Sequence, residues 1–144
     1  MTTPMLSVWQ PWASLLTLGI KSIETRCDPA PEALVGRRIA LHASSTPSKD
    51  QVFRWVEWKY PEAVERLKAA GLDWPELPRG VVLATATLAE TRKTDWRDWP
   101  KTMSPVEDFW GWCFEDIRPL DAPIAFAAEA GLHEVELEIP GLES

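Results

Sequence analysis

The charged residues between positions 19 and 26 have the types and spacing of a small anion- or base-binding site. Lys21, Glu24 and Arg26 follow Gly19 in the pattern Gly-x-Lys-x-x-Glu-x-Arg. Two cations can hold a phosphate, and a carboxylate can orient an arginine or accept a hydrogen bond from a base or ribose. The alternative is an ordinary exposed ion pair between Glu24 and Arg26, worth about 0–1 kcal/mol.

A strand predicted over Ile20–Arg26 decides which of these charges face the same way. Alternation along that strand places Glu24 and Arg26 on one face and Lys21 on the other. Lys21 joins the site only if the strand begins after it or carries a bulge.

A strand and a short helix come before the charges and must position them. Leu6–Trp9 is typical of a strand, and Gln10 and Pro11 mark a helix start, with apolar residues at helical spacing up to Gly19. We expect the helix start to offer free N–H groups and a positive dipole end to an anion. We expect Gln10 and Trp12 to join the site there. Trp12 either stacks on a base, worth about 1–3 kcal/mol, or packs beneath the helix.

The remaining pattern predicts an α+β fold. Further strands are predicted over 38–44, 81–88, 110–115 and 135–139, and helices over 46–59 and 61–71, with a turn between Pro119 and Pro123. All the helices fall in the first half. About six strands and three helices indicate a small mixed β-barrel with helices packed on its outside. No repeat or linker interrupts the chain, so we expect one domain over residues 1–144.

The strand predicted over Arg38–Ser44 carries a second group of polar side chains. Ile39 and Leu41 alternate with the polar face, on which Arg38, His42 and Ser44 lie. We expect these three residues to contribute to nucleic-acid binding. His42 also has the chemistry of an acid–base group near neutral pH, although a lone histidine on a barrel strand favours a hydrogen-bonded structural role.

The net charge of −7 argues against a nucleic-acid partner, but the charge is unevenly distributed. Residues 1–60 carry seven Lys or Arg and five Asp or Glu, and the remainder carries eight and seventeen. An anion site is therefore expected in the first half of the chain.

Composition excludes several other classes of protein. The two cysteines lie far apart and the two histidines have no ligand-like neighbours, so we expect no metal and no cofactor. No apolar run reaches the roughly 20 residues that cross a bilayer, and no signal peptide is visible, so we expect no membrane partner and a cytoplasmic location. The oligomeric state is left open by the sequence.

The stretch from Leu6 to Arg26 resembles the opening of ASCH domains, in which a QPWAS-like segment leads through a helix to the Gly-x-Lys-x-x-Glu-x-Arg motif. The resemblance continues through residues 36–44, 80–89 and 111–123. It implies a PUA-like β-barrel with a cleft lined by the motif, and a role in RNA or DNA binding. The family's Gly-rich ending with a terminal aromatic residue is weak here.

Three functions are therefore considered for the site. The first is binding of RNA or another single-stranded nucleic acid without chemistry. The second is hydrolysis, with Lys21 and Glu24 as the catalytic residues, either of RNA without a metal or of a modified nucleoside. Some small ASCH proteins cleave acylated cytidine with a Lys and a Thr three residues later; here that later position is Glu24, and Thr25 is expected to face the other way. The third is a protein-interaction domain that uses the acidic half.

Overall fold

The computed structural model describes residues 2–74, 76–103 and 109–142. Within them the strands are β1 (Thr3–Val8), β2 (Ile23–Arg26), β3 (Arg38–Ala43), β4 (Val81–Lys93), β5 (Trp110–Ala125) and β6 (Gly131–Val135). The helices are α1 (Trp12–Thr17), α2 (Asp50–Lys59), α3 (Pro61–Ala69) and α4 (Trp99–Thr102), with short 3-10 turns η1 (Glu32–Leu34) and η2 (Trp96–Asp98).

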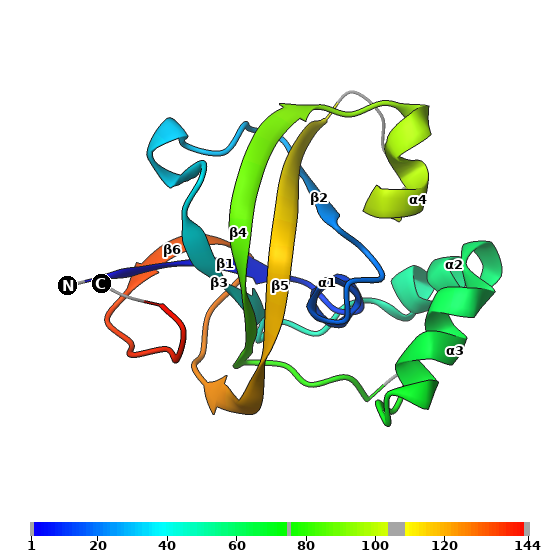
Figure 1. The fold of residues 1–144 in the computed structure, drawn as a ribbon. Helices are drawn as coiled ribbons and strands as arrows, with labels where there is room; N and C mark the ends of the chain where they lie inside the picture. The colour runs from blue at the N-terminus through cyan, green and yellow to red at the C-terminus, as the bar shows by residue number, and fades with distance from the viewer. Residues whose placement is uncertain (1, 75, 104–108, 143–144) are drawn as a thin grey trace.

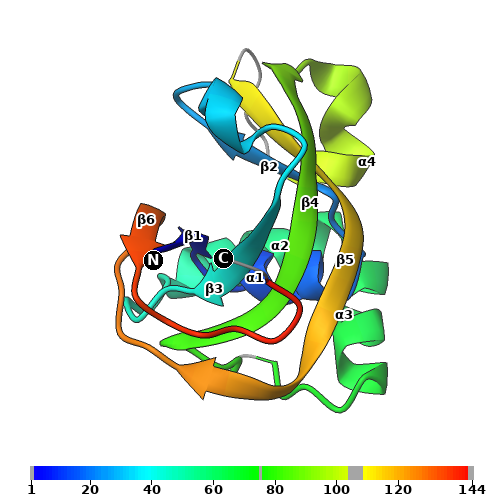
Figure 2. The same ribbon diagram turned by 60° about the vertical axis from the view of Figure 1, so that its left-hand side comes forward.

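All these strands join one mixed sheet that curls into a half-barrel (Figures 1 and 2). The order across the sheet is β2-β5-β4-β3-β1-β6, in which only β1 and β3 run parallel. The long strands β4 and β5 pair with several register shifts, and such bulges bend a sheet. The α+β barrel predicted from the sequence is confirmed. Its two edges are β2 on one side and β6, beside β1, on the other.

The concave face of the sheet is filled by α1 and by apolar side chains of the inner strands. Leu6 and Val8 of β1 pack there with Ala13 and Leu16 of α1. Leu15, on another face of α1, packs instead against α2 and α3. Fully burying one leucine contributes about 1.5–3 kcal/mol, so α1 is held from two sides and the residues at its start are fixed in place.

The convex face is partly covered by the C-terminal part of the chain. Met5 and Ala40 point to this face and pack with Val135 and Ile139. The alternation predicted for 38–44 is confirmed, because Ile39 and Leu41 belong to the concave core and Ala40 to the convex one. Both faces are nevertheless buried there, and the polar face predicted from the sequence is not open to solvent.

Two elements of the first half differ from the sequence prediction. The strand expected over Ile20–Arg26 begins only at Ile23, because Ile20 and Lys21 turn back to donate their N–H groups to the carbonyl of Leu15. The helix expected from Thr46 begins at Asp50, with Lys49 in an extended conformation at its N-cap.

The second half departs further from the prediction. β5 passes through Pro119 and Pro123 without a turn, because the register between β4 and β5 shifts there and a bulge tolerates proline. A fourth helix, α4, lies in this half, and the last strand pairs with β1 over Gly131–Val135 rather than 135–139. Part of the loop expected over 95–108, residues 104–108, lies outside the described residues. None of the described helices has the length and apolar character needed to span a membrane.

Candidate functional site

A cleft of about 240 Å³ lies where the two edges of the curled sheet approach each other. One wall comes from β2 and the residue Lys21 before it, and the other from the end of β1, the start of α1 and the segment before β6. We call it the motif cleft, and its lining residues are Ser7, Val8, Trp9, Trp12, Lys21, Glu24, Thr25, Arg26 and Ala130. Apart from Ala130, the less acidic half of the chain builds it.

Lys21 is buried beneath this cleft and its ammonium group is held by three partners. Its Nζ lies 3.2 Å from Oε1 of Glu24 and donates a hydrogen bond to the carbonyl of Thr102. The same Nζ lies 5.3 Å from the centroid of the Trp12 ring, within cation–π range. Only 1% of Lys21 is exposed, so these partners replace the water that the charge has lost.

Burial and pairing act on the Lys21 amine in opposite directions. Burial lowers the pKa of Lys21 from its ordinary value, and the carboxylate of Glu24 opposes that shift. The amine is therefore closer to neutrality than an exposed lysine would be, which is a property of lysines that act as bases or nucleophiles.

Glu24 connects the buried lysine to the open cleft. Its side chain keeps 10% of its surface exposed, and its Oε1 forms the ion pair with Lys21. The other oxygen, Oε2, has no hydrogen-bond partner among the described residues and is not one of their buried unsatisfied atoms. Solvent therefore reaches Oε2, which can accept a hydrogen bond from a ligand in the cleft.

Arg26 presents an unpaired guanidinium group at the outer end of the cleft. The group lies 5.5 Å from the centroid of the Trp112 ring, and it makes no hydrogen bond or ion pair with the described residues. The expected Glu24–Arg26 pair is not formed, because Glu24 pairs with Lys21 instead. The N–H donors of Arg26 are thus available to an anion.

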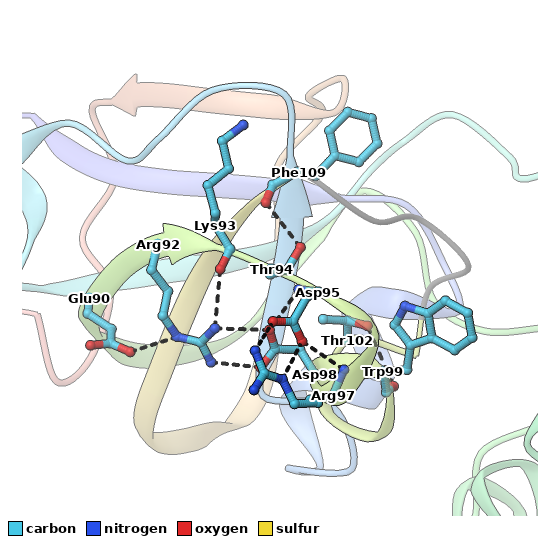
Figure 3. A network of polar contacts seen from close by, with 10 residues as sticks. All are labelled: Glu90, Arg92, Lys93, Thr94, Asp95, Arg97, Asp98, Trp99, Thr102 and Phe109. Atoms are coloured by element: carbon cyan, nitrogen blue, oxygen red, sulfur yellow. Dashed lines mark hydrogen bonds and ion pairs between the residues drawn. The ribbon is translucent and has the colours of Figure 1, made fainter.

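The segment that supplies Lys21 with its carbonyl partner is held by a network of charged residues (Figure 3). Arg92 of β4 donates two hydrogen bonds to the carboxylate of Asp98, at 2.8 and 2.9 Å. Asp98 also accepts from the N–H of Asp95, and Asp95 accepts from the N–H of Arg97 in a capping box at η2. The hydrogen bonds from Arg97 hold the pKa of Asp95 at about 2.

This network fixes α4 against the start of β2. The carbonyl of Lys101 accepts a hydrogen bond from the N–H of Ser22, and the next carbonyl, that of Thr102, accepts from Lys21. The charged network of Figure 3 therefore positions a binding residue without touching the cleft.

Two tryptophans line the motif cleft with different exposure. Trp9 is 50% exposed, whereas Trp12 is half-buried and packs edge-on against Trp55 at 6.4 Å. Lys21 and Trp55 contact the Trp12 ring, which also lines the cleft, and stacking of a base on this ring stays a prediction. Trp9 offers the larger free aromatic surface.

The anion site predicted at the helix start is not formed. The N–H groups of Ala13 and Leu15 donate to backbone carbonyls, and that of Ser14 donates to Oε1 of Gln10. Gln10 is 2% exposed and also donates to the side chain of Ser14 and to the carbonyl of Pro78. Gln10 is therefore not among the residues that line the motif cleft, because its amide is engaged with Ser14 and Pro78.

His42 and Ser44 are buried and lie outside the cleft lining. Nε2 of His42 donates to the carbonyl of Phe126, so Nδ1 accepts the hydroxyl hydrogen of Ser7 at 2.8 Å. Burial lowers the pKa of His42, which keeps the ring neutral. Ser44 accepts a hydrogen bond from the N–H of Thr46. The hydrogen-bonded structural role that the sequence favoured for His42 agrees with this geometry, and neither His42 nor Ser44 is among the residues that line the motif cleft.

Arg38 is also used within the fold rather than at the cleft. Its guanidinium pairs with the side chain of Asp116 and donates to Oγ1 of Thr85 at 3.0 Å. Arg38 is not among the residues that line the motif cleft, since its donors are directed at β4 and β5.

Five residues of the lining were not among the site residues predicted from the sequence: Ser7, Val8, Trp9, Thr25 and Ala130. The sequence did contain a signal that Trp9 could line the cleft, because this aromatic residue directly follows a buried strand. Thr25 lines the cleft beside Glu24 although alternation placed it on the opposite face, because the lining includes both sides of the short edge strand β2. Ala130 had no signal, because it reaches the cleft only through the β1–β6 pairing.

The side chains of the motif cleft differ from those of a metal site. Among the described residues of the chain, no group of three or more His, Cys, Asp or Glu lies close enough together to hold a metal ion. The motif cleft instead combines one carboxylate, two cations and two indole rings.

A curled mixed sheet with a helix in its concave face and a cleft between its edges defines a PUA-like half-barrel. The chain belongs to the ASCH domain family, whose model matches residues 6–124.

Two solved structures of the family have the same fold. A crystal structure of ASCH from Zymomonas mobilis is 16% identical to this chain, with a TM-score of 0.58 over 92% of this chain and 87% of that one. A mutant of the Zymomonas mobilis protein has the same identity and coverage and a TM-score of 0.55. No curated protein sequence matches the chain.

Proposed function

We propose that the motif cleft binds single-stranded nucleic acid, with RNA as its main ligand. The observation that supports the proposal is the convergence of Lys21, Glu24 and Arg26 with Trp9 and Trp12 on one cleft. Single strands are bound by aromatic rings that stack on bases and by cations that neutralise the backbone. The resemblance to ASCH domains implies the same class of partner.

Each cleft residue has a distinct part in this proposal. Trp9 stacks on a base through its exposed ring, and Oε2 of Glu24 accepts a hydrogen bond from an amino or imino group of that base. Arg26 binds the adjacent phosphate with its free N–H donors. Lys21 orients Glu24 and balances its charge, so it acts mainly by positioning.

The negative net charge of the protein limits the affinity for a nucleic acid. The salt dependence of binding then reports how many phosphates the cleft contacts. With a net charge of −7, the protein repels a polyanion except near the cleft. Each phosphate contact on a single strand contributes about −0.7 to the slope of log K against log salt. We expect a shallow slope that corresponds to one or two contacts.

The test is binding of a labelled hexaribonucleotide by fluorescence anisotropy at several salt concentrations. Arg26→Gln lowers the affinity and reduces the magnitude of the salt slope by about 0.7. The matched control is Arg66→Gln, which removes the same charge from an exposed position on α3. Equal affinities and slopes for the wild type and Arg26→Gln, at unchanged stability, would contradict the proposed site.

One observation favours a second function, hydrolysis of RNA or of an acylated nucleoside. Burial lowers the pKa of Lys21, and Thr25 lines the same cleft, so an amine base and a hydroxyl lie on one surface. Incubation with labelled single-stranded RNA and with N4-acetylcytidine tests it. A product that the wild type forms and Lys21→Met does not would show catalysis, and its absence would leave a binding module.

A further inference from the structure

A second hollow adjoins the motif cleft on the far side of Arg26. It encloses about 460 Å³, and we call it the outer hollow. The residues that the two hollows share are Thr25 and Arg26. The other lining residues of the outer hollow are Cys27, Asp28, Pro29, Pro31, Trp112 and Leu132.

Both hollows follow the same line along the half-barrel. In each, residues on or just beyond β2 face residues on or just before the opposite edge strand, β6: Ala130 in the motif cleft and Leu132 in the outer hollow. The two hollows therefore adjoin each other between the sheet edges and share the wall formed by Thr25 and Arg26, and we call the two together the groove. A groove of this shape suits an extended strand better than a single compact ligand.

The two halves of the groove differ in chemistry. The motif cleft contains Lys21 and Glu24, whereas the outer hollow is lined by the apolar side chains of Pro29, Pro31 and Leu132 and by one carboxylate, that of Asp28. A polar cleft can read the edge of one base by hydrogen bonds. Apolar side chains can receive the flat face of a base or a ribose without such reading.

Arg26 has the geometry of a phosphate ligand between these halves. One side of its guanidinium faces the Trp112 ring, which is 3% exposed and donates its Nε1 hydrogen to the carbonyl of Asp28 at 2.9 Å. Trp112 thus supports both the arginine and the loop that forms the outer hollow. Arg38, Arg92 and Arg118 are neutralised by carboxylates, whereas Arg26 has none among the described residues.

We propose that the groove holds two consecutive nucleotides of one strand, with a base in the motif cleft, the next nucleotide in the outer hollow and the phosphodiester between them on Arg26. This inference rests on the proposed function and adds that the smallest complete ligand is a dinucleotide.

Cys27 supplies a direct reporter for the outer hollow. Its thiol is exposed and belongs to the wall of that hollow, whereas Cys113 is half-buried and lines neither hollow. The wild-type protein is alkylated with iodoacetamide in the presence of a nucleoside or a dinucleoside monophosphate, each in ribo and deoxyribo form. The rate at each cysteine is read by mass spectrometry of the peptides.

The expected result separates the two ligands. At ten times its Kd, the dinucleotide slows alkylation of Cys27 by about tenfold, because only the unoccupied protein reacts. The nucleoside, which fills the motif cleft alone, leaves the rate at Cys27 near that of the free protein. Cys113 reacts at the same rate throughout and serves as the internal control.

A second measurement tests the bridging phosphate. Arg26→Gln lowers the affinity for the dinucleotide by about tenfold or more, since a charge-assisted hydrogen bond contributes about 1.5–3 kcal/mol. It weakens nucleoside binding less, because a nucleoside has no phosphate.

The outcomes distinguish this inference from the proposed function. A dinucleotide that binds while Cys27 reacts at its free rate overturns the second subsite and leaves the proposed function standing. Failure of every nucleoside, dinucleotide and hexanucleotide to bind overturns both.

Discussion

Replacing Lys21 by methionine tests the central claim about the site, that a buried ion pair positions Glu24. Lys21 is 1% exposed and Glu24 is 7% exposed, with 3.2 Å between Nζ and Oε1. Methionine fills much of the same volume but leaves the Glu24 carboxylate buried without a cation.

The magnitude follows from the distance and the burial. Two unit charges 3.2 Å apart attract by about 5 kcal/mol at an effective dielectric constant near 20. Loss of one partner from a buried pair destabilises proteins by about 3–5 kcal/mol, and we expect Lys21→Met to fall in that range. Since a chain of 144 residues has a stability of roughly 7–20 kcal/mol, the variant still folds.

Urea unfolding at neutral pH gives the free energies of unfolding for Lys21→Met, Glu24→Gln and the double variant. The double variant retains about 2–3 kcal/mol more stability than the sum of the two single losses predicts, which is the coupling energy of the pair. The matched control is Lys68→Met, because Lys68 and Glu65 have the same types and spacing but are exposed, with 3.8 Å between them. That control loses no more than about 0.5 kcal/mol.

A coupling energy below about 1 kcal/mol, the range of exposed pairs, would refute the reasoning. The ion pair would then be incidental, and Glu24 would need another source of orientation.

Three further predictions concern the surroundings of the site. Burial lowers the pKa of His42 in the folded protein. As the pH falls, this histidine is therefore protonated in the unfolded chain at a higher pH than in the folded protein. The wild type should therefore lose up to about 2 kcal/mol more than His42→Gln between pH 6.5 and 5 in pH-dependent urea unfolding. Gly111→Ala places a Cβ 2.7 and 2.9 Å from two side-chain carbons, so thermal unfolding should show a loss of about 1–3 kcal/mol. Arg92→Gln removes the bidentate pair that holds the α4 segment, and hydrogen exchange should become faster at the amide of Ser22, with exchange in β3 unchanged as the internal reference.

The local signals in the sequence were sufficient for the motif and for most of the elements around it. The spacing of Lys21, Glu24 and Arg26 indicated an anion or base site, and these residues do line one cleft. The alternation in β3 and the apolar run of β4 depend on neighbours within a few residues, so the start of each strand was predicted correctly, although β4 extends to Lys93, beyond the predicted 81–88.

The sequence rules did not predict which charged residues of the motif form an ion pair. Alternation joined Glu24 to Arg26, but the structure joins Glu24 to Lys21, because β2 begins after Lys21. The partner that completes the site for Lys21 is the carbonyl of Thr102, 81 residues later, on a helix that the sequence did not predict.

The same division applies to the whole chain. Residue types and short spacings determined the α+β class, the family resemblance and the residues with binding chemistry, because these depend on side chains close together in sequence. The tertiary structure alone decided that Gln10, Arg38 and His42 are used inside the fold while Trp9 and Arg26 line the cleft. The physical reason is that each polar group forms hydrogen bonds with whatever the curl of the sheet brings near it, and that curl is set by pairing between strands distant in the chain.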